Sequence, residues 1–320
     1  MQVTVPSFAK LNLDLRVLHK RPDGYHELRT VFQTISLKDT LAIEFDLKKR
    51  TQIELSCSFD IADNLVVRSA KLVLDYLRIH AWVRFVLEKR IPMGAGLGGG
   101  SSNAAAVLLA LPALAGRRIP PSELVRLAGS LGSDVPFFLS GGTALGFGRG
   151  TELYPLRDQP SRPVVVVASG IPVSTADAYR RLKRGPASAL TSSAESPILR
   201  EFQTIAWSLD SSSLDQLPLK NDFEEPVFET HRELASVSRK LRRLGARPAR
   251  MTGSGSAVFG IFQTREQARR AARQFPSGTA WPVRFVNRRQ YATLWRRALG
   301  AAAASSCFAN PEESHNHVRA

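Results

Sequence analysis

The sequence predicts an α+β protein built from two lobes. Apolar and polar residues alternate through most of the first ninety positions, as in strands that bury one face. A glycine-rich segment, GAGLGGGSSN at residues 94–103, leads directly into small apolar residues typical of a buried helix. The proline-containing segment 158–163 precedes a second half with a different order of elements. We therefore expect one lobe over residues 1–158, a second over 159–297, and a tail without regular structure over 298–320.

Period-two and period-3.6 patterns predict the elements of the first lobe. Leu11, Leu13, Leu15 and Val17 alternate with polar residues, which predicts a half-buried strand, and the RPDG turn follows at residues 21–24. In order, the further predicted elements are strands at 41–45 and 53–59, a helix at 64–79, a strand at 83–87, helices from Ser102 to about Leu111 and from Ser122 to near Gly132, and a hairpin at 143–156.

The second lobe begins with four consecutive valines, which predict a buried strand at residues 164–167. Helical patterns then cover residues 176–182 and 222–244, with a loop between them. A strand, a second glycine loop, a strand, a helix and a last strand complete the predicted order. Residues after 300 are small and polar, and we assign them no element.

The chain is strongly basic, with 44 Lys and Arg against 28 Asp and Glu and a net charge of +16. This balance suits a nucleic-acid partner. However, the basic residues are dispersed apart from clusters at 48–50, 239–243 and 288–297, and no nucleic-acid-binding motif accompanies them. We therefore expect no nucleic-acid partner, and a small phosphorylated substrate would benefit from the same positive field.

Other features point to a cytoplasmic protein. No apolar run approaches the roughly 18 residues of a membrane span, and the N-terminus lacks the pattern of a secretion signal. Cys57 and Cys307 lie far apart and match no metal or disulfide spacing. The oligomeric state stays open.

Three phosphate-binding motifs compete for the glycine segment. The P-loop needs a lysine where Ser101 and Ser102 follow the glycines. The dinucleotide fingerprint matches at Gly94, Gly96 and Gly99 but lacks the second strand and its acidic residue. Protein-kinase motifs are absent from the sequence downstream. What remains is a loop whose bare backbone and following helix bind phosphate, or, as the alternative, a tight turn that lets a strand and a helix pack closely.

Several segments resemble the GHMP small-molecule kinases. PMGAGLGGGSSNAA resembles their ATP-binding loop. SFAKLNLDLRVLHKRPDGYHELRTVFQTISLKDTL resembles the opening of the branch that acts on a cytidine diphosphate-linked methylerythritol. LGSDVPFFLSGG, NDFEEPV and MTGSGSAVF resemble three later motifs. The matches run in the same order over roughly residues 1–290, which is far more specific than one pattern. The tail after about Arg297 has no counterpart.

The resemblance implies the two-lobed GHMP kinase fold, with a ribosomal-protein-S5-like N-terminal lobe and a ferredoxin-like C-terminal lobe. It implies ATP-dependent phosphorylation of the 2-hydroxyl of the cytidine diphosphate-linked substrate, in the non-mevalonate isoprenoid precursor pathway. Mg²⁺ is expected with ATP, held largely by phosphates and water, and we assign it no protein ligand. Asp134 is the expected base, and Lys10 is expected to hydrogen-bond the acceptor hydroxyl.

The remaining site residues also follow from the resemblance. Tyr25 is expected to stack on the cytosine ring, His26 to contact its polar edge, and Tyr179 to cover the opposite face. Asn12 and Thr175 are further expected substrate contacts. The second glycine loop, Gly253, Ser254 and Gly255, is expected to close over the phosphates. The expected ATP-binding residues are Pro92, Met93, Gly94, Ala95, Gly96, Leu97, Gly98, Gly99, Gly100, Ser101 and Ser102.

Two alternatives remain at this point. The first is another GHMP kinase, for mevalonate or homoserine, against which the GYH triplet and the longer glycine loop argue. The second is a non-catalytic nucleic-acid-binding protein, because the implied first lobe resembles a ribosomal protein and the chain is basic. Lys10, Asp134 and two glycine loops argue against it, since a phosphate-backbone binder needs none of them.

Overall fold

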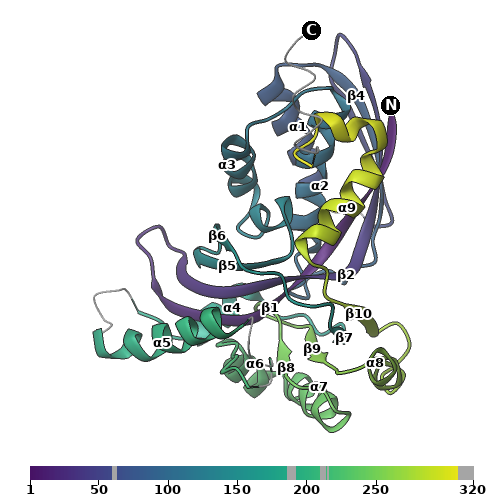
Figure 1. Ribbon diagram of the computed structural model, residues 1–320. Helices are drawn as coiled ribbons and strands as arrows, with labels where there is room; N and C mark the ends of the chain where they lie inside the picture. Colours follow the sequence, from purple (N-terminus) through teal and green to yellow (C-terminus); the bar gives the residue numbers. More distant parts are fainter. Residues whose placement is uncertain (60–62, 186–191, 210–213, 215, 309–320) are drawn as a thin grey trace.

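The structure, a computed structural model, describes residues 1–59, 63–185, 192–209, 214 and 216–308. Two sheets organise it. The first contains six strands in the order β3-β4-β2-β5-β6, with β1 paired to β2, and the second contains four in the order β10-β7-β9-β8. Figure 1 shows helices packed on one side of the larger sheet, and the smaller sheet with its helices below it. None of the described helices is both long enough and apolar enough to span a membrane.

The first lobe follows the predicted order closely. Its strands are β1 (Gln2–Lys20), β2 (His26–Leu47), β3 (Gln52–Cys57), β4 (Ala81–Glu88), β5 (Thr143–Gly148) and β6 (Glu152–Pro155). Its helices are α1 (Leu65–Leu77), α2 (Gly99–Leu114) and α3 (Pro121–Leu131), followed by a short 3-10 helix at Pro136–Leu139. The pairing is antiparallel except between β3 and β4.

The second lobe holds β7 (Pro163–Val167), β8 (Ala249–Met251), β9 (Val258–Ile261) and β10 (Ala280–Arg284). Its helices are α4 (Thr175–Arg181), α5 (Ser192–Ser208), α6 (Glu224–Thr230), α7 (Arg232–Arg243) and α8 (Arg265–Ala272). The sequence analysis missed α5, whose Ser- and Pro-containing first turns read as a loop. The single helix predicted at 222–244 is two helices, because His231 has a non-helical backbone.

Strand β1 is buried on both faces, so the predicted half-buried strand is wrong in this respect. Residues 5–18 are all buried, polar ones included. The second lobe covers the face expected to meet water: the Leu15 amide donates to the Lys220 carbonyl (2.8 Å), and the Asp222 amide donates to the Leu15 carbonyl (2.9 Å). The polar residues of β1 therefore lie between the lobes.

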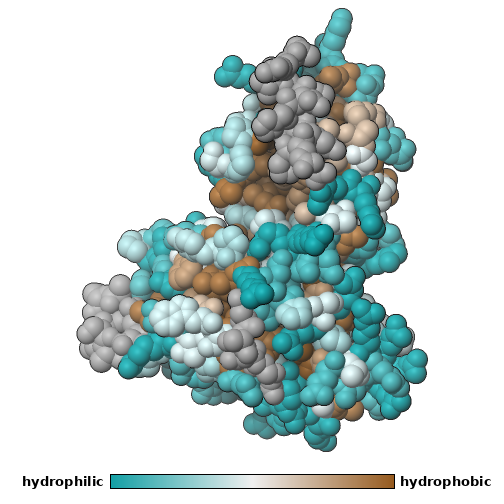
Figure 2. All heavy atoms as spheres, viewed as in Figure 1, coloured by the Kyte–Doolittle hydropathy of each residue, from teal (hydrophilic) through white to brown (hydrophobic). Residues whose placement is uncertain are grey.

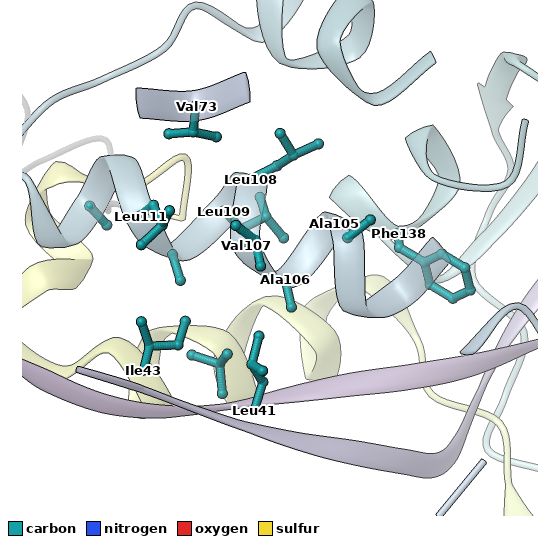
Figure 3. Close-up of a cluster of buried hydrophobic side chains, with 14 of the residues drawn as sticks. Leu41, Ile43, Val73, Ala105, Ala106, Val107, Leu108, Leu109, Leu111 and Phe138 are labelled. Atoms are coloured by element: carbon teal, nitrogen blue, oxygen red, sulfur yellow. The ribbon is translucent and has the colours of Figure 1, made fainter. Parts of the chain in front are cut away.

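Helix α2 is the centre of the larger core. Its side chains are buried from Ser102 to Leu114, all round the helix. Figure 3 shows them facing Val73 of α1 on one side and Leu41 and Ile43 of β2 on the other. The predicted start at Ser102 is wrong: the helix begins at Gly99 after Gly98, which has a left-handed backbone (φ 73°).

The last helix, α9 (Arg288–Leu299), returns to the first lobe, whereas the sequence analysis placed residues up to 297 in the second. Tyr291 packs on Phe8 with ring centroids 5.4 Å apart, and its hydroxyl donates to the Phe138 carbonyl. Figure 1 shows α9, in yellow, beside α2. Apolar side chains on α9 complete the core around α2. Sequence periodicity predicts that α9 has a buried face, but it does not show which lobe covers that face.

The segment after α9 has structure as far as residue 308. A 3-10 helix spans Gly300–Ser305, and the Phe308 ring stacks on Trp295 with centroids 5.6 Å apart. The tail without regular structure was expected from residue 298, so this part differs from the expectation. Residues 309–320 lie outside the described residues. The lobe boundary near residue 158 stays a prediction.

Candidate active site

The two glycine loops pack against each other. Gly96 and Gly253 both have left-handed backbones, with φ of 76° and 59°. A Cβ on Gly96 would lie 2.4 Å from the Thr252 carbonyl oxygen, and one on Gly253 would lie 3.2 Å from the Gly96 Cα. The Ala257 amide also donates to the Ala95 carbonyl (3.1 Å). The second loop therefore braces the first directly, in addition to whatever it does toward a phosphate.

The glycines of the first loop differ in what surrounds them. A Cβ on Gly98 would meet the Phe138 ring at 2.8 Å and the Lys10 side chain at 3.1 Å. Gly94 also has a left-handed backbone (φ 65°), but nothing lies within 4 Å of its missing Cβ. Close packing explains Gly96 and Gly98, whereas open space lies beside Gly94. The packing interpretation thus holds at Gly96 and Gly98, and phosphate binding by the loop stays a prediction.

The start of α2 is open to an anion. No side chain caps the helix, so the amides of its first turn keep donors free, and the helix dipole adds positive potential. The Ser102 hydroxyl in that turn is buried and has no hydrogen-bond partner among the residues that the structure describes, while Ser101 is partly exposed. An unpartnered hydroxyl at a helix N-terminus suits a phosphate oxygen or the metal ion that accompanies it. The described residues contain no cluster of three or more His, Cys, Asp or Glu able to hold a metal.

A cavity of about 600 Å³ lies beside the glycine loop. Its walls come from the segment before α2, from the loop after β7, and from the loop before β10. Many lining side chains are apolar, as in a site for a planar base. The cavity lining includes Ile91, Pro92, Met93, Gly94, Ala95, Ile171, Pro172, Val173 and Trp281.

Behind this cavity lies a buried network that the sequence analysis missed. Asp39 on β2 is fully buried and accepts hydrogen bonds from the amides of Arg90 (2.7 Å) and Ile91 (2.8 Å). It also accepts from the Asn103 side chain (3.0 Å) and from Lys89 Nζ. The network thereby ties the segment that follows β4 to the N-terminal part of α2. The one sequence feature that could have indicated this network was an aspartate, Asp39, among the apolar residues of β2.

Lys10 and Asp134, which are 124 positions apart, meet in the structure. Lys10 Nζ lies 3.3 Å from Asp134 Oδ2, and their side chains are 4% and 32% exposed. The Lys10 amide donates to the Leu97 carbonyl (3.0 Å), so β1 carries the lysine directly against the glycine loop. Asp134 lies in the turn that precedes the 3-10 helix at Pro136–Leu139. A buried ammonium thus faces a partly exposed carboxylate beside the first glycine loop.

Asn12 lies next to this pair. Its Oδ1 accepts a hydrogen bond from Lys10 Nζ (2.7 Å), and its Nδ2 donates to Thr30 Oγ1 (2.8 Å). Its amide donates to Thr252 Oγ1 (3.0 Å), next to the second glycine loop. The side chain is buried, and these contacts orient the Lys10 ammonium toward Asp134.

Each of the three predicted base-binding residues has a side chain packed on its ring, and for Tyr25 that side chain is Arg149, which was not predicted. Tyr25 is half exposed, and the Arg149 guanidinium covers one face of its ring at 3.4 Å from the centroid. The His26 ring stacks on Tyr179, with centroids 4.6 Å apart and planes 24° apart. His26 therefore covers a face of Tyr179, where the resemblance implied the base. Thr175 Oγ1 lies 2.8 Å from Ser254 Oγ, so α4 touches the second glycine loop.

The electrostatics of this region follow from burial. Burial, with a smaller contribution from the Asp134 charge, raises the pKa of Tyr179 to about 12. Asp134 and Tyr179 therefore lie close enough for the Asp134 charge to act on the Tyr179 hydroxyl. Burial lowers the pKa of His26, and the nearby charges of Lys20 and His19 lower it further. His26 is thus a neutral imidazole at neutral pH, with one donor and one acceptor nitrogen.

Comparisons with known proteins identify the family. The model of the GHMP kinases N terminal domain matches residues 64–142, and that of the GHMP kinases C terminal region matches residues 202–278. A 4-diphosphocytidyl-2-C-methyl-D-erythritol kinase from Solibacter usitatus is 53% identical over 293 residues, which cover 92% of each chain. The chain belongs to the GHMP kinase family. A protein of the same name from Thermus thermophilus is 40% identical over 277 residues, covering 85% of this GHMP kinase and 93% of the relative.

Solved structures confirm the predicted two-lobed GHMP kinase fold. A 4-(cytidine 5'-diphospho)-2C-methyl-D-erythritol kinase matches with a TM-score of 0.73 and 39% identity, over 89% of this GHMP kinase and 99% of that chain. A homoserine kinase from Cytophaga hutchinsonii has a TM-score of 0.69 at 18% identity, over 90% and 96% of the two chains, which is a likeness of fold alone. The fold by itself therefore does not identify the acceptor substrate.

Proposed function

We propose that this GHMP kinase transfers the γ-phosphoryl group of ATP to the 2-hydroxyl of 4-diphosphocytidyl-2-C-methyl-D-erythritol, in the cytoplasm, as a step of the non-mevalonate isoprenoid precursor pathway. The observation that carries the proposal is the contact of 3.3 Å between Lys10 and Asp134 beside the glycine loop. The names of relatives that are 53% and 40% identical support the choice of acceptor.

Asp134 acts as the base. The acceptor hydroxyl donates its proton to an Asp134 oxygen while its own oxygen attacks the γ-phosphorus, and ADP leaves. Lys10 Nζ lies 3.3 Å from Asp134 Oδ2, and its charge stabilises the negative charge that develops on the reacting oxygen. Because Asn12 holds the Lys10 ammonium, this charge is in place before the reaction begins.

The nucleotide binds in the cavity beside the glycine loop and at the N-terminus of α2. Its base lies among the apolar residues of the cavity, and its phosphates meet the free amides of the first turn and the Ser102 hydroxyl. Ser102 would hold Mg²⁺ together with the phosphates, and that ion supplies compensation of the phosphate charge when bound. Asp39 fixes the backbone on which both contacts depend.

The acceptor's cytosine binds at the Tyr25 and His26 end. Arg149 already covers one face of the Tyr25 ring, so the opposite face is available for stacking. The neutral His26 offers a donor and an acceptor to the polar edge of the base. Tyr179, on α4, stacks on the His26 ring and so supports this imidazole from the second lobe.

A coupled assay of ADP formation tests the acceptor. We expect turnover with the cytidine diphosphate-linked substrate and far slower turnover with mevalonate or homoserine, because only the first offers a base to Tyr25. Tyr25→Ala should raise KM for that substrate about 5- to 150-fold, equivalent to the roughly 1–3 kcal/mol of one stacking partner. KM for ATP should not change.

Tyr25→Phe is the matched control, because it keeps the ring and removes only the hydroxyl. It should behave like the unmodified protein. A lower melting temperature with an unchanged acceptor KM in Tyr25→Ala would mean that Tyr25 only packs the turn. Preferred turnover of mevalonate or homoserine would overturn the proposed acceptor.

A further inference from the structure

The second lobe contains a cavity that the proposed reaction does not use. It measures about 900 Å³ and shares no lining residue with the cavity beside the glycine loop. Its walls come from the end of α4, the segment before α6, the helices α6 and α7, and β8. Figure 2 shows a largely hydrophilic surface over the lower lobe. The charged lining residues are Arg181, Lys183, Arg184, Lys220, Arg239, Arg242 and Arg250, with Asp222, Glu224, Glu225 and Glu229.

The cations in this wall outnumber the acids, and the inner acids are already occupied. Glu224 accepts a hydrogen bond from the Met251 amide (2.7 Å), and Asp222 accepts from the Val17 amide (2.9 Å). Arg239 and Arg242, both exposed on α7, contact Ser236 Oγ and the Ala249 carbonyl. Neither forms a salt bridge to any residue that the structure describes. Their charge is therefore available to a ligand.

Two buried donors in this wall lack partners. Ser238 is 3% exposed, and its hydroxyl has no hydrogen-bond partner within the described residues. Arg184 Nε is buried and unpartnered in the same way. A buried donor without an acceptor costs about 1–3 kcal/mol, so two of them at one cationic cavity point to an acceptor that comes from outside.

We propose that this cavity binds a small multivalent phosphate anion, such as inorganic diphosphate. Arg239 and Arg242 supply charge from α7. Arg184, whose terminal nitrogen pairs with Asp222 (3.3 Å), donates through its Nε, and the Ser238 hydroxyl donates a further hydrogen bond. The volume of about 900 Å³ accommodates such an anion with its water shell. The basic cluster at residues 239–243, which the phosphoryl-transfer site leaves unused, then has a ligand.

The cavity is connected to the active site by two routes. Residues 181–184 continue α4, which carries Tyr179. Asn221, in the opposite wall, donates hydrogen bonds to the carbonyls of Met251 and Gly253 at 2.8 Å each, and so holds the second glycine loop. An anion that fixes these walls therefore alters acceptor binding. This coupling rests on the proposed function, whereas binding of the anion does not.

Titration of the full chain with inorganic diphosphate by calorimetry tests the site, with inorganic phosphate as the weaker comparison. The double variant Arg239→Ala, Arg242→Ala should bind diphosphate at least about tenfold more weakly, since each charge-assisted hydrogen bond contributes about 1.5–3 kcal/mol. Arg243→Ala is the matched control on the same helix, because Arg243 is exposed and does not line the cavity. It should bind as the unmodified protein does.

Ser238→Ala separates ligand binding from folding. It removes an unpartnered donor, so the melting temperature without anion should stay the same or rise while diphosphate affinity falls several-fold. Unchanged affinity in the double variant, or an equal loss in Arg243→Ala, would overturn the site. For the coupling, saturating diphosphate should change acceptor KM at least about twofold in the unmodified protein and not in the double variant. Equal KM values with and without diphosphate would overturn the coupling alone, and absence of kinase activity would overturn the proposed function while leaving the calorimetric result intact.

Discussion

Strand β1 carries two cations six residues apart, each paired with a carboxylate, and the two pairs have opposite surroundings. In the middle of the strand, Lys10 faces Asp134, whose side chain is 32% exposed. Further along, Arg16 faces Asp14, and their side chains are 3% and 0% exposed. Both cations belong to the same alternating pattern of one strand. The covering segments make the difference between the pairs.

Residues 220–222 close the second pair off from water. The Lys220 amide donates to Asp14 Oδ1 (2.8 Å), and Arg16 reaches Glu201 of α5 (2.7 Å). The first pair lies beside the first glycine loop, where a Cβ on Gly98 would come within 3.1 Å of the Lys10 side chain, and its carboxylate stays partly exposed. The comparison teaches that an ion pair keeps an accessible carboxylate where the chain leaves it partly uncovered, and joins the lobes where the chain covers it. Three substitutions test this division, beginning with the largest expected effect.

Asp134→Asn should reduce turnover roughly 10²- to 10⁴-fold, because asparagine keeps the shape but does not take up the hydroxyl proton. Acceptor and ATP binding should stay within a few-fold of the original values. Because the buried Lys10 ammonium loses its counter-charge but keeps its hydrogen bond to Asn12, the melting temperature should fall by less than in Arg16→Met. Steady-state kinetics and thermal unfolding check this. Near-normal turnover would remove Asp134 from the mechanism and erase the distinction between the two pairs.

Arg16→Met should instead act on stability. It leaves the Asp14 carboxylate buried without its cation, which costs about 3–5 kcal/mol of unfolding free energy at pH 8. Turnover per folded molecule should be unchanged, because Arg16 does not reach the glycine loops. Denaturant unfolding and kinetics on the same samples separate the two effects. A large fall in turnover would mean that the joint between the lobes also sets the active geometry.

The loss in Arg16→Met should shrink as the pH falls. Burial outweighs the Arg16 charge and raises the pKa of Asp14 to about 6, against 3.8 as its ordinary value. A raised folded-state pKa means that protonated Asp14 favours folding, and this contribution is lost as the pH rises from about 4 to about 6. Without Arg16 the pKa rises further, so Asp14 takes up a proton more easily. A loss of equal size at pH 5 and pH 8 would contradict this account.

Asn12→Ala should have the smallest effect. It should lower both turnover and stability. The change removes the acceptor that orients Lys10, and it removes the side-chain hydrogen bonds of Asn12 with the Thr30 (2.8 Å) and Thr252 (3.4 Å) hydroxyls. We expect turnover to drop about tenfold and the unfolding free energy to drop about 1–3 kcal/mol. Thr30→Val is the control, because it removes the hydrogen bonds at Thr30 and leaves the one between Lys10 and Asn12. It should lower stability with little change in turnover.

Much of the candidate site could be predicted from short motifs. Glycines at 94, 96 and 98 do have the left-handed backbones that only glycine adopts easily, and they lead into a helix start. The pairing of Lys10 with Asp134 was available only through the family resemblance, because no local pattern relates residues that far apart. The arrangement of His26 against Tyr179 was not available at all, since it depends on how α4 packs on the β1–β2 ribbon.

The network around Asp39 shows why other parts were missed. Its members lie on β2, after β4 and in α2, and each is an ordinary polar residue in its own segment. Only the fold brings them within hydrogen-bond distance. The same reason applies to α9: its apolar stripe predicts burial somewhere, and the choice of the first lobe depends on the space that α2 and Phe8 leave.

The sequence by itself determined the α+β composition, most of the strands and helices, and the two glycine turns, because periodicity and glycine backbone freedom act over a few residues. The tertiary structure alone decided that the polar residues at positions 5–18 of β1 are buried, and which of them pair with a partly exposed acid and which with a buried one. It also decided which lobe α9 completes, and which donors near α7 remain without acceptors. These outcomes depend on contacts between segments far apart in the chain, and such contacts leave no periodic trace in the sequence.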